Sequence, residues 1–564
     1  MARKRLTGII LILMLAAAGI VWTFTNLSLD EGYETAMAYR FLSGDRLVFE
    51  MWEPHQTSAF LTAFLMSLFH GVTGTYEGVI LFLHACGIVL RGLVAFFIFK
   101  VLKTDFTPEV SGCAAAFFFM ISPKDLAMPE FSNLQVWFGA LCFLFIILYF
   151  RKKNMLYLIL SALSLCFEII AYPSCIIVFI PAMLLIRHYA DPEDRARALI
   201  LYTSVCVVAG FLFLSFVRVA AGPGDILEAL ENILNQEPSH TVSLWGKFLA
   251  YFKDLAWITA VVVGIVFIAI KISSRICGKD AAPKRIKRTS ILISNGVMLV
   301  LFLVNIISAK DRCFYGILFY YLIILGFVLT RELPFTERRV FYTGTYISIA
   351  GFAATLLLTD LPIIVSSPYL VLAVALSVIP IGRFYAMDED PKLRTGIRIA
   401  VFAFVFLLFA RCIYIRTPLT GREQICSVLN TDLSLIRKGP AKGMITDDFG
   451  ARKQVDSYDE FRNLIPEGSN VWIVDTLCDN LGYMYGDYMV SAPSVISDPK
   501  FVPGFDRYWN NNPRKLPDVV AVSAYEGELS YEVSVKEAFM KWLKEEYRPV
   551  RTVYGRFYHY YFRE

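Results

Sequence analysis

The feature that most constrains this chain is a succession of apolar runs that continues to about residue 415. A helix needs about 20 mostly apolar residues to cross a bilayer, and about thirteen runs of that kind precede residue 416. They lie near residues 7–25, 77–101, 108–123, 132–150, 155–171, 173–187, 198–219, 254–272, 291–309, 313–331, 340–358, 363–383 and 398–415. Hydrophobic residues make up 56% of the 564 and charged residues only 18%, which is more apolar surface than a soluble core can bury. Residues 1–415 are therefore predicted to form a polytopic α-helical membrane domain.

The basic residues between these runs predict how the chain is oriented. With the basic N-terminus in the cytoplasm and the runs crossing in alternation, every strong basic cluster falls on the cytoplasmic side, as the positive-inside rule requires. These clusters are residues 151–153, 187–197, 284–288, 338–339 and 392–398. The same alternation places residues 26–76 and everything after 416 on the exterior face. The sequence thus predicts a multi-pass protein of the cell (plasma) membrane with a cytoplasmic N-terminus and an exterior C-terminal domain.

Residues 416–564 have the mixed pattern of a small soluble α/β domain. Strands are expected at 443–446, 470–475, 518–523 and 558–562, and helices at 458–464 and 535–547. No Gly-rich phosphate-binding fingerprint occurs in this part, which argues against nucleotide binding there. Cys426 and Cys478 could form one disulfide on the exterior face or remain reduced. The domain is expected to bind a partner or to stabilise the exterior face of the membrane domain.

The first loop, residues 26–76, gathers ionisable side chains directly after the first span. They are Asp30, Glu31, Glu34, Glu50, Glu53 and His55. In one interpretation Ser28 and Glu31 form a capping box, and the acids simply favour the start of a helix that lies on the membrane surface and ends near Gly44. In the other, carboxylates held against a bilayer are partly desolvated, which raises their pKa toward the range of a general base. The concentration of these groups in one short segment favours the second interpretation.

An Asp-Glu pair just outside the first span, a surface helix that ends near a glycine, and a second polar segment at Glu53-Pro54-His55 resemble the multispanning GT-C glycosyltransferases, which use sugars linked to a lipid phosphate. Protein O-mannosyltransferases and bacterial aminoarabinose transferases typify this class. The likeness covers the membrane domain and includes the number of spans and the exterior C-terminal domain. Asp30 matches the catalytic acidic residue of the class, and Glu31 matches its partner. Glu53-Pro54-His55 matches the second polar cluster of the class only in part, because the usual motif there is His-x-Pro-Pro.

The resemblance implies a membrane glycosyltransferase that moves a sugar from a polyprenyl-phosphate donor to a cell-envelope glycan, lipid or protein on the exterior face. The attacking group must lose a proton, a task that suits the Asp30 carboxylate, and the leaving phosphate must meet positive charge. Lys310 and Arg312 are expected to supply that charge, with Lys124 as a further candidate. Snorkelling at the interface would account for Lys310 and Arg312 equally well. The substrate-binding set predicted from the sequence is Glu53, His55, Lys124, Glu130, Asn133, Lys310 and Arg312.

The sequence identifies no definite cofactor. A metal could also meet the leaving phosphate, and Asp30, Glu31 and His55 could hold a divalent cation, but their spacing is not diagnostic of a metal site. The basic residues form no single stripe, so nucleic acid is not an expected partner. Two rival functions remain open, a polytopic lipid flippase or transporter and a non-catalytic scaffold of the cell envelope. The transporter is disfavoured because the sequence has neither an internal repeat nor paired spans broken by Gly or Pro.

Overall fold

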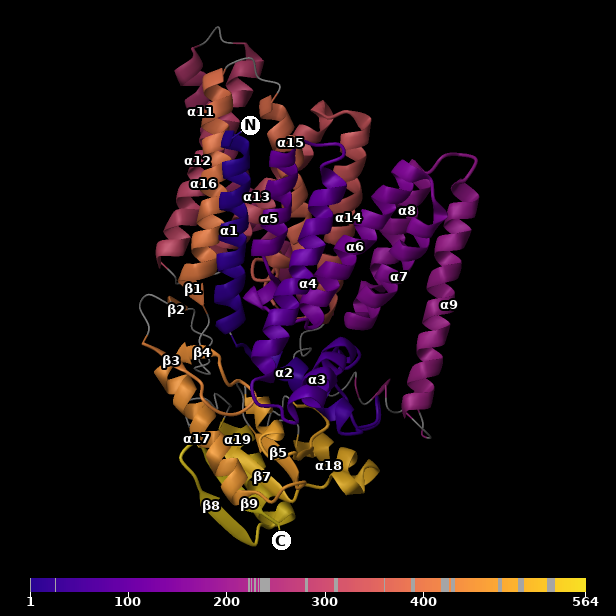
Figure 1. The fold of residues 1–564 in the computed structure, drawn as a ribbon, viewed down its shortest axis with the longest axis vertical. Coiled ribbons are helices and arrows are strands. Elements are labelled where there is room, and N and C mark those ends of the chain that lie inside the picture. The colour runs from indigo at the N-terminus through magenta and orange to yellow at the C-terminus, as the bar shows by residue number, and fades with distance from the viewer. Residues whose placement is uncertain are drawn as a thin grey trace.

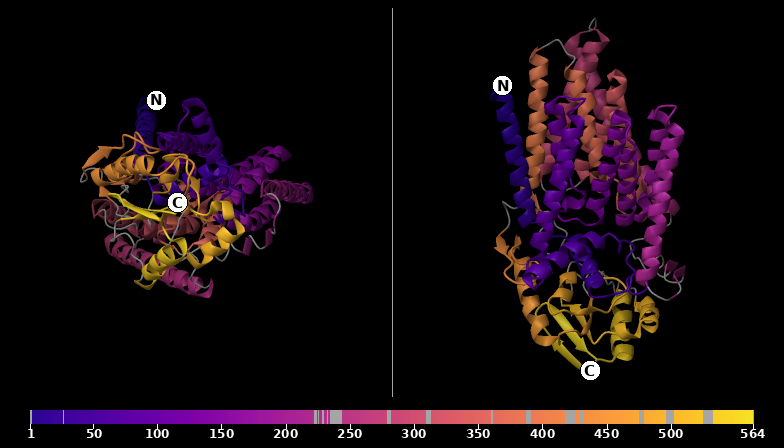
Figure 2. Two further views of the ribbon diagram at one scale, coloured as in Figure 1. Left: turned by 90° about the horizontal axis from the view of Figure 1, so that it is seen from below. Right: turned by 45° about the vertical axis from the view of Figure 1, so that its right-hand side comes forward.

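The computed structural model has two parts, a long helical bundle and a smaller α/β domain at one end of it (Figure 1). It describes residues 2–563 except for 26, 222–223, 225, 228–229, 232, 234–243, 279–281, 309–312, 360, 387–390, 417–425, 428–431, 475–478, 496–501 and 525–532. The N-terminus lies at the end of the bundle away from the C-terminal domain (Figures 1 and 2). The two termini are therefore at opposite ends of the molecule.

Every apolar run marked in the sequence coincides with a helix. The helices of the bundle are α1 (Ala2–Phe24), α4 (Val79–Leu102), α5 (Pro108–Met120), α6 (Phe131–Lys152), α7 (Met155–Ala171), α8 (Phe179–Tyr189), α9 (Arg195–Ala221), α11 (Leu244–Cys277), α12 (Pro283–Ser308), α13 (Cys313–Leu329), α14 (Phe335–Leu358), α15 (Val371–Ala386) and α16 (Pro391–Tyr414). Within the described residues, 7 helices are long and apolar enough to cross a membrane, or 8 if the bent pair of α1 and the following helix counts as one span. The other apolar helical segments among the described residues have 10–17 residues, including the part of α16 from Val401 to Ile413. The predicted helical membrane architecture is thus present, while the count of about thirteen spans stays a prediction.

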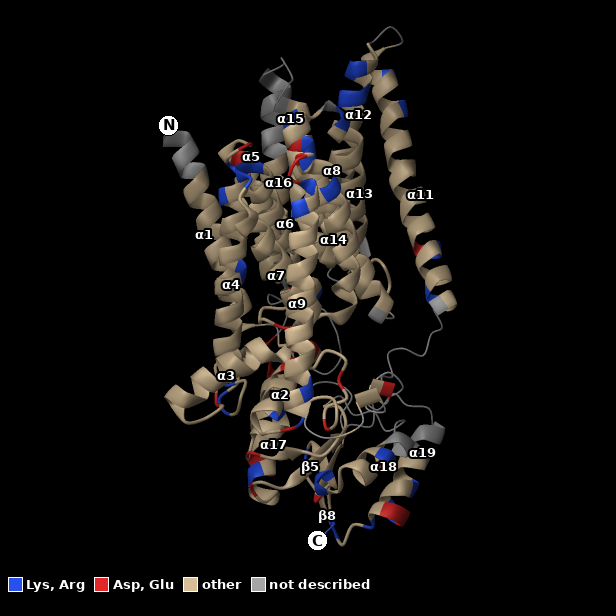
Figure 3. Ribbon diagram, turned by 90° about the vertical axis from the view of Figure 1, so that its right-hand side faces the viewer, with Lys and Arg blue, Asp and Glu red and all other residues tan. Residues whose placement is uncertain are grey.

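Burial divides the bundle into a centre and a margin. Helices α6 and α15 are buried along most of their length, whereas α9 stands at the margin and leaves Phe211, Leu212 and Val219 exposed (Figure 1). A helix that is apolar all round and exposed is stable only when lipid surrounds it. Lys and Arg gather at the end of the bundle that carries the N-terminus, and few lie along its length (Figure 3). This distribution of charge is typical of a bundle that crosses a membrane.

The C-terminal domain is built on a five-stranded sheet in the order β6-β5-β7-β9-β8. β5 (Asn470–Val474), β6 (Met489–Val490) and β7 (Val519–Ser523) run parallel, and β8 (Arg551–Tyr554) and β9 (Tyr558–Phe562) are antiparallel to their neighbours. Two small hairpins precede the sheet, β1 (Ile415–Arg416) with β2 (Cys426–Ser427) and β3 (Leu433–Leu435) with β4 (Ile445–Asp447). The strands expected at 443–446, 470–475, 518–523 and 558–562 correspond to β4, β5, β7 and β9. Cys478 lies outside the described residues, so its pairing with Cys426 stays a prediction.

Three helices cover the two faces of this sheet, namely α17 (Asp448–Leu464), α18 (Val502–Asn511) and α19 (Val533–Trp542). On one face the Trp472 ring of β5 packs edge-on against Phe505 of α18 and Phe539 of α19. On the other face Phe461 of α17 packs against Tyr560 of β9. Because both faces are covered, β5 and β7 are almost continuously apolar and buried, as the strands of a parallel sheet usually are.

The first loop fills the space between the bundle and the C-terminal domain. It contains α2 (Leu29–Leu42) and α3 (Ala59–Thr73). The segment that follows β6 bonds directly to this loop: the Trp52 N–H donates to the Pro493 carbonyl at 2.8 Å, and the Val495 N–H donates to Glu53 Oε1 at 3.0 Å. Because β5, β6 and β7 are parallel, their carboxyl ends all point toward the loop. Helix α2 is consequently buried on every side over most of its length, whereas the sequence predicted a helix on the membrane surface with one buried face.

Candidate active site

Asp30 and Lys124 meet where the bundle adjoins the C-terminal domain. Asp30 lies in the first turn of α2, where the helix dipole favours a carboxylate. Lys124 lies in η1 (Pro123–Asp125), a short turn between α5 and α6. Its Nζ lies 2.5 Å from Asp30 Oδ2, although the two residues are 94 positions apart in the sequence. The side chains of Lys124 and Asp30 are 23% and 19% exposed, so a ligand can reach both charges.

The turn that carries Lys124 has an unusual backbone. Lys124 and Asp125 have φ values of 53° and 59°, in the left-handed region that non-glycine residues seldom adopt. Arg411 lies near the end of α16, and its Nη1 and Nη2 donate to Asp125 Oδ1 and Oδ2, each at 2.8 Å. Backbone strain of this kind persists only where the surrounding structure holds it. The position of the Lys124 ammonium is therefore fixed by the fold.

An aromatic wall, formed by His55, Phe131 and Tyr172, borders the Asp30–Lys124 pair. The Lys124 Nζ lies 5.3 Å from the centre of the Phe131 ring. His55 stacks on Phe131 at 4.5 Å with ring planes 5° apart, and its ring lies 4.6 Å from that of Tyr172. The fold thus brings His55 to the site, as expected from the sequence. Phe131 and Tyr172 were not predicted, because aromatic residues in apolar runs look like ordinary core residues. Pro173, which follows α7, was a sequence signal that the helix ends at Tyr172.

Two buried carboxyl groups stand behind the pair. Glu130 caps α6 and accepts the N–H groups of Ser132 and Asn133, each at 2.7 Å. Glu34 accepts the Ser58 hydroxyl at 2.7 Å. Burial raises the pKa of Glu130 to about 8. Burial also raises the pKa of Glu34 well above its ordinary value, and the nearby Glu130 raises it further. With a pKa of about 8, Glu130 is mostly protonated at neutral pH and adds little negative charge to the site.

Glu31, the predicted partner of Asp30, has no exposed surface. Its Oε1 accepts the N–H groups of Ala127 and Met128 at 2.9 and 3.3 Å, and its Oε2 accepts that of Ser28 at 3.1 Å. The Nε2 of His84, in α4, lies 3.3 Å from Oε1. Glu31 thus ties the start of α2 to α4 and to the segment after η1. These contacts suit a residue that positions its neighbours, whereas direct participation in a reaction stays a prediction.

Asn133 is also fully engaged with its surroundings. Its Oδ1 accepts the Ser122 hydroxyl at 3.0 Å and a guanidinium N–H of Arg91, and its Nδ2 donates to the carbonyls of Leu126 and Met128 at 3.2 and 2.8 Å. Arg91, a buried charge within α4, is thereby bonded to the segment 122–133. Asn133 shapes the turn that presents Lys124, and its predicted contact with substrate remains untested.

Glu53, which was also predicted to bind substrate, lies away from the Asp30–Lys124 pair. Glu53 is buried at the contact with the C-terminal domain, where Arg40 Nη1 donates to its Oε1 at 2.9 Å. The structure therefore separates Glu53 from Asp30, although both belong to the first loop. Lys310 and Arg312 lie outside the described residues.

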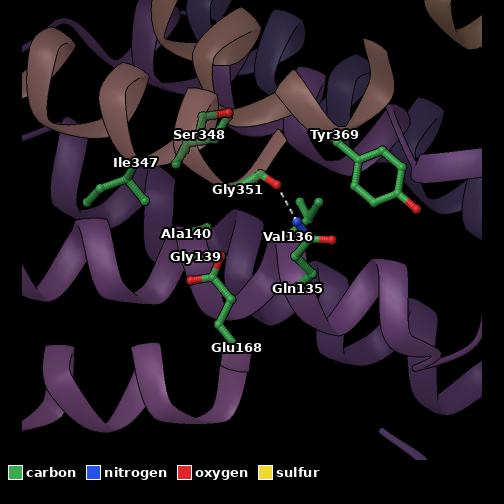
Figure 4. A pocket seen from close by; sticks show the side chains of 10 residues that line it. Gln135, Val136, Gly139, Ala140, Glu168, Ile347, Ser348, Gly351 and Tyr369 are labelled. Atoms are coloured by element: carbon green, nitrogen blue, oxygen red, sulfur yellow. Dashed lines mark hydrogen bonds between the residues drawn. The ribbon is translucent and has the colours of Figure 1, made fainter. Parts of the chain in front are cut away.

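A small cavity lies among residues of α6, α7, α14 and α15 (Figure 4). It measures about 20 Å³, which is room for about one water molecule. Glu168 lies one helical turn below Tyr172, and its carboxyl group points into the cavity, between Gly139 and Gly351. Gln135 borders the same space and donates to the Gly351 carbonyl at 2.7 Å. Buried polar groups thus continue from the site into the bundle.

Among the described residues, no three His, Cys, Asp or Glu side chains gather closely enough to hold a metal ion. Glu31 is turned toward its backbone partners, and His55 is stacked in the aromatic wall. A divalent cation held by Asp30, Glu31 and His55 stays a prediction.

No protein-family model and no curated protein matches this chain. Its structure is similar to three solved glycosyltransferases. AglB oligosaccharyltransferase from Archaeoglobus fulgidus, in complex with an inhibitory peptide and a dolichol-phosphate, is 11% identical over 94% of this chain and 71% of its own, with a TM-score of 0.44. ArnT from Cupriavidus metallidurans bound to undecaprenyl phosphate is 11% identical over 99% and 98%, with a TM-score of 0.44. Arabinosyltransferase EmbB from Mycobacterium smegmatis is 13% identical over 71% and 43%, with a TM-score of 0.33.

All three belong to the GT-C class, the class that the sequence resembles. At TM-scores below 0.5 such a likeness carries no conclusion about the reaction, which rests on the site itself.

Proposed function

We propose that this protein is a GT-C-type membrane glycosyltransferase that moves a sugar from a polyprenyl-phosphate donor to a cell-envelope acceptor. The observation that carries the proposal is the reachable Asp30–Lys124 pair at the polar end of an apolar bundle. A polyprenyl phosphate is amphiphilic, because its chain needs lipid and its phosphate attracts cations at the depth of the headgroups. A lysine and a carboxylate at the boundary of the bundle suit both parts of such a donor.

We propose that the reaction takes place on the exterior face of the membrane. The basic residues gather at the end of the bundle that carries the N-terminus, and such ends stay in the cytoplasm (Figure 3). Helix α2, which carries Asp30 and through it contacts Lys124, lies toward the opposite end, next to the C-terminal domain (Figure 1). The protein is therefore proposed to lie in the cell membrane with its site and its C-terminal domain outside.

The two charges have separate tasks in the transfer. Asp30 accepts the proton of the acceptor hydroxyl or amine as that group bonds to the anomeric carbon, and the bond from this carbon to the phosphate oxygen breaks. The phosphate leaves with the electron pair, and the Lys124 ammonium neutralises it. Burial disfavours a charge on Lys124, but the neighbouring Asp30 outweighs burial and raises the pKa of the lysine, which keeps it protonated.

The contact between these charges gives the reaction an order. Without donor, Lys124 and Asp30 neutralise each other. A donor phosphate that reaches Lys124 competes with Asp30 for the ammonium, because phosphate is a strong acceptor of charge-assisted hydrogen bonds. The carboxylate is then free to accept a proton from the acceptor. Donor binding thus precedes activation of the base.

The surrounding groups support this chemistry. Glu130, with a pKa of about 8, is mostly protonated at neutral pH and so adds little repulsion of the donor phosphate, and burial raises the pKa of Glu34 in the same direction. The aromatic wall offers flat apolar faces beside the reacting charges, against which a substrate can be oriented. Glu31 holds the first turn of α2 against the segment that follows Lys124, and it therefore acts as a positioning residue.

Asp30→Asn tests the proposal once the donor is known. Mass spectrometry of the lipid that copurifies with the protein is expected to find a polyprenyl phosphate or its sugar adduct. With that donor, Asp30→Asn should bind at least as tightly as the unaltered protein, because the competitor for Lys124 is gone, but transfer about 10²–10⁴-fold more slowly, because a general base contributes about that much. Asp191→Asn is the matched control, since it removes an exposed carboxylate paired with Lys153 away from the site.

Each other outcome contradicts the proposal. Transfer at the normal rate by Asp30→Asn excludes Asp30 as the base. Lipid that moves between leaflets without any sugar transfer by the unaltered protein indicates a flippase or transporter. A protein that neither transfers sugar nor moves lipid is a scaffold.

A further inference from the structure

We propose that Arg40 is a positioning residue, which fastens α2 to the C-terminal domain and thereby fixes the place of Asp30. Its importance for transfer rests on the proposed function, whereas the fastening itself does not. The structural basis is a buried charge cluster made of Arg40, Asp45, Glu50 and Glu53 from the first loop with Arg514 and Lys515 from the C-terminal domain.

The Arg40 guanidinium, which has no exposed surface, bonds on all sides. Its Nε donates to Asp45 Oδ2 at 2.8 Å, and its Nη1 donates to Glu53 Oε1 at 2.9 Å and to the Pro493 carbonyl at 3.1 Å. Its Nη2 donates to the Glu50 carbonyl. A guanidinium has five N–H donors in a fixed planar arrangement, so this set of acceptors defines its orientation. Arg40 thus gathers its own loop and the C-terminal domain around one rigid group.

The C-terminal domain completes the cluster from the other side. Lys515 donates to Asp45 Oδ1 and to the Val490 carbonyl, the latter at 3.2 Å. Arg514 Nε donates to Glu50 Oε1 at 2.8 Å. Asp45 therefore bonds to a cation from each part of the protein. The three anions of the first loop face four cations: Arg40 and Lys515 are buried, whereas the side chains of Arg514 and Arg46, which both pair with Glu50, are 65% and 35% exposed.

The geometry of α2 connects this cluster to the proposed base. Asp30 and Arg40 lie in the first and last turns of one helix of 14 residues. At about 1.5 Å per residue, the ten positions between them span roughly 15 Å of regular helix. A helix that is packed on all sides and fastened at one end has little freedom to shift or tilt at the other. The C-terminal domain therefore acts on Asp30 without touching it.

A buried ionic cluster is not an efficient way to gain stability, because removing charges from water offsets much of their attraction. Such clusters can instead specify one arrangement over others, since their partners are directional. Directional bonding is what a positioning role requires. An apolar contact of the same area would hold the loop but leave its register less defined.

Arg40→Lys and Lys515→Met test the proposal from the two sides of the cluster. The first keeps the charge but loses the planar donor set, and the second removes a cation that is not on α2. Hydrogen exchange of the α2 backbone amides, measured without substrate, should rise at least tenfold in both variants. With donor and acceptor, kcat should fall at least tenfold while KM for the donor, which contacts Lys124, stays unchanged.

Lys442→Ala is the matched control. Lys442 pairs with Glu77 across the same two parts of the protein at 2.7 Å, but both side chains are well exposed. Exchange in α2 should equal that of the unaltered protein. If Arg40→Lys folds poorly, Lys515→Met provides the same measurement.

The outcomes separate this proposal from the proposed function. Unchanged exchange of α2 in Lys515→Met, or an equal rise in Lys442→Ala, overturns the positioning role. Raised exchange in a protein that never transfers sugar supports the fastening and overturns only the proposed function. A rise in donor KM with kcat unchanged overturns the link to Asp30.

Discussion

Two groups of charged side chains share helix α2 and differ in how they are surrounded. In the first turn, Asp30 contacts Lys124, and both side chains stay partly exposed. Near the last turn, Arg40 is fully buried, and its donors meet acceptors from the first loop and from the C-terminal domain. The residue types are the same, carboxylates beside basic groups. Burial and the number of fixed partners therefore decide which group can exchange a partner for a substrate and which holds the structure together.

The comparison also separates what each group contributes. A carboxylate with one displaceable partner contributes little to stability and much to chemistry. A buried cation with several partners contributes much to stability and little to chemistry, because its removal leaves uncompensated charges behind. Substitutions should thus affect stability in a graded order that follows burial.

Arg40→Met should have the largest effect on stability. It leaves Asp45 and Glu53 buried without their cation, which costs about 3–5 kcal/mol. Thermal unfolding of the purified protein in lipid nanodiscs measures this loss. An unfolding temperature equal to that of the unaltered protein would show that the buried charge cluster is not a stabilising contact.

Glu53→Gln should have an intermediate effect. The amide keeps the shape of the side chain but weakens a charge-assisted hydrogen bond to Arg40, at about 1–3 kcal/mol. Because Glu53 belongs to the cluster that fastens α2, the folded fraction should transfer sugar more slowly than the unaltered protein, but faster than Arg40→Lys. Loss of transfer with stability intact would instead place Glu53 in the substrate site, as the sequence predicted.

Glu130 gives the protein a dependence on pH. Burial raises its pKa from 4.5 to about 8, so the folded protein binds this proton more tightly than the unfolded chain. The stability that it contributes is complete below about pH 4.5 and is lost as pH rises through about 8, at no more than about 1.4 kcal/mol per pH unit. Unfolding temperatures of Glu130→Gln across this range should lack that slope. Parallel curves for the two proteins would contradict the raised pKa.

Asp30→Asn should have the smallest effect on stability. The pair with Lys124 is partly exposed, and such pairs are worth less than about 1 kcal/mol. The unfolding temperature should therefore stay close to that of the unaltered protein while transfer is lost. A large fall in unfolding temperature would mean that Asp30 resembles Arg40, and the distinction between the two groups would fail.

Much of the fold could be predicted because it depends on local patterns. The length of an apolar run decides where a helix can cross a bilayer, and all thirteen runs coincide with helices. The strands β5 and β7 follow from short apolar segments between turn residues. The number of membrane spans is harder to predict from the sequence, because α5, α7 and α13 have fewer than 18 residues and are short for a helix that crosses a membrane.

The candidate site could be predicted only in part, because it depends on distant contacts. Asp30 and Lys124 were both candidates, but nothing in their spacing indicated that they meet. Glu53 was grouped with Asp30 because the two are close in sequence, whereas the first loop turns between them and places Glu53 against the C-terminal domain. Arg40 was overlooked, since a single arginine in a polar helix looks like ordinary surface charge.

The carboxyl edge of the parallel strands has a consequence for how the protein is made. In open α/β sheets this edge is commonly where a ligand binds, and here the first loop occupies it. Asp45 cannot pair with Lys515 until 470 more residues have been synthesised. At about 5–20 residues per second, that synthesis takes roughly 20–90 s. Until then the acids of the loop have only Arg40 and Arg46 of the loop itself as basic partners, and Arg514 and Lys515 are still missing. A chain that is cut short before β7 would insert its helices in the membrane and still lack a settled site, so that only completed molecules become active.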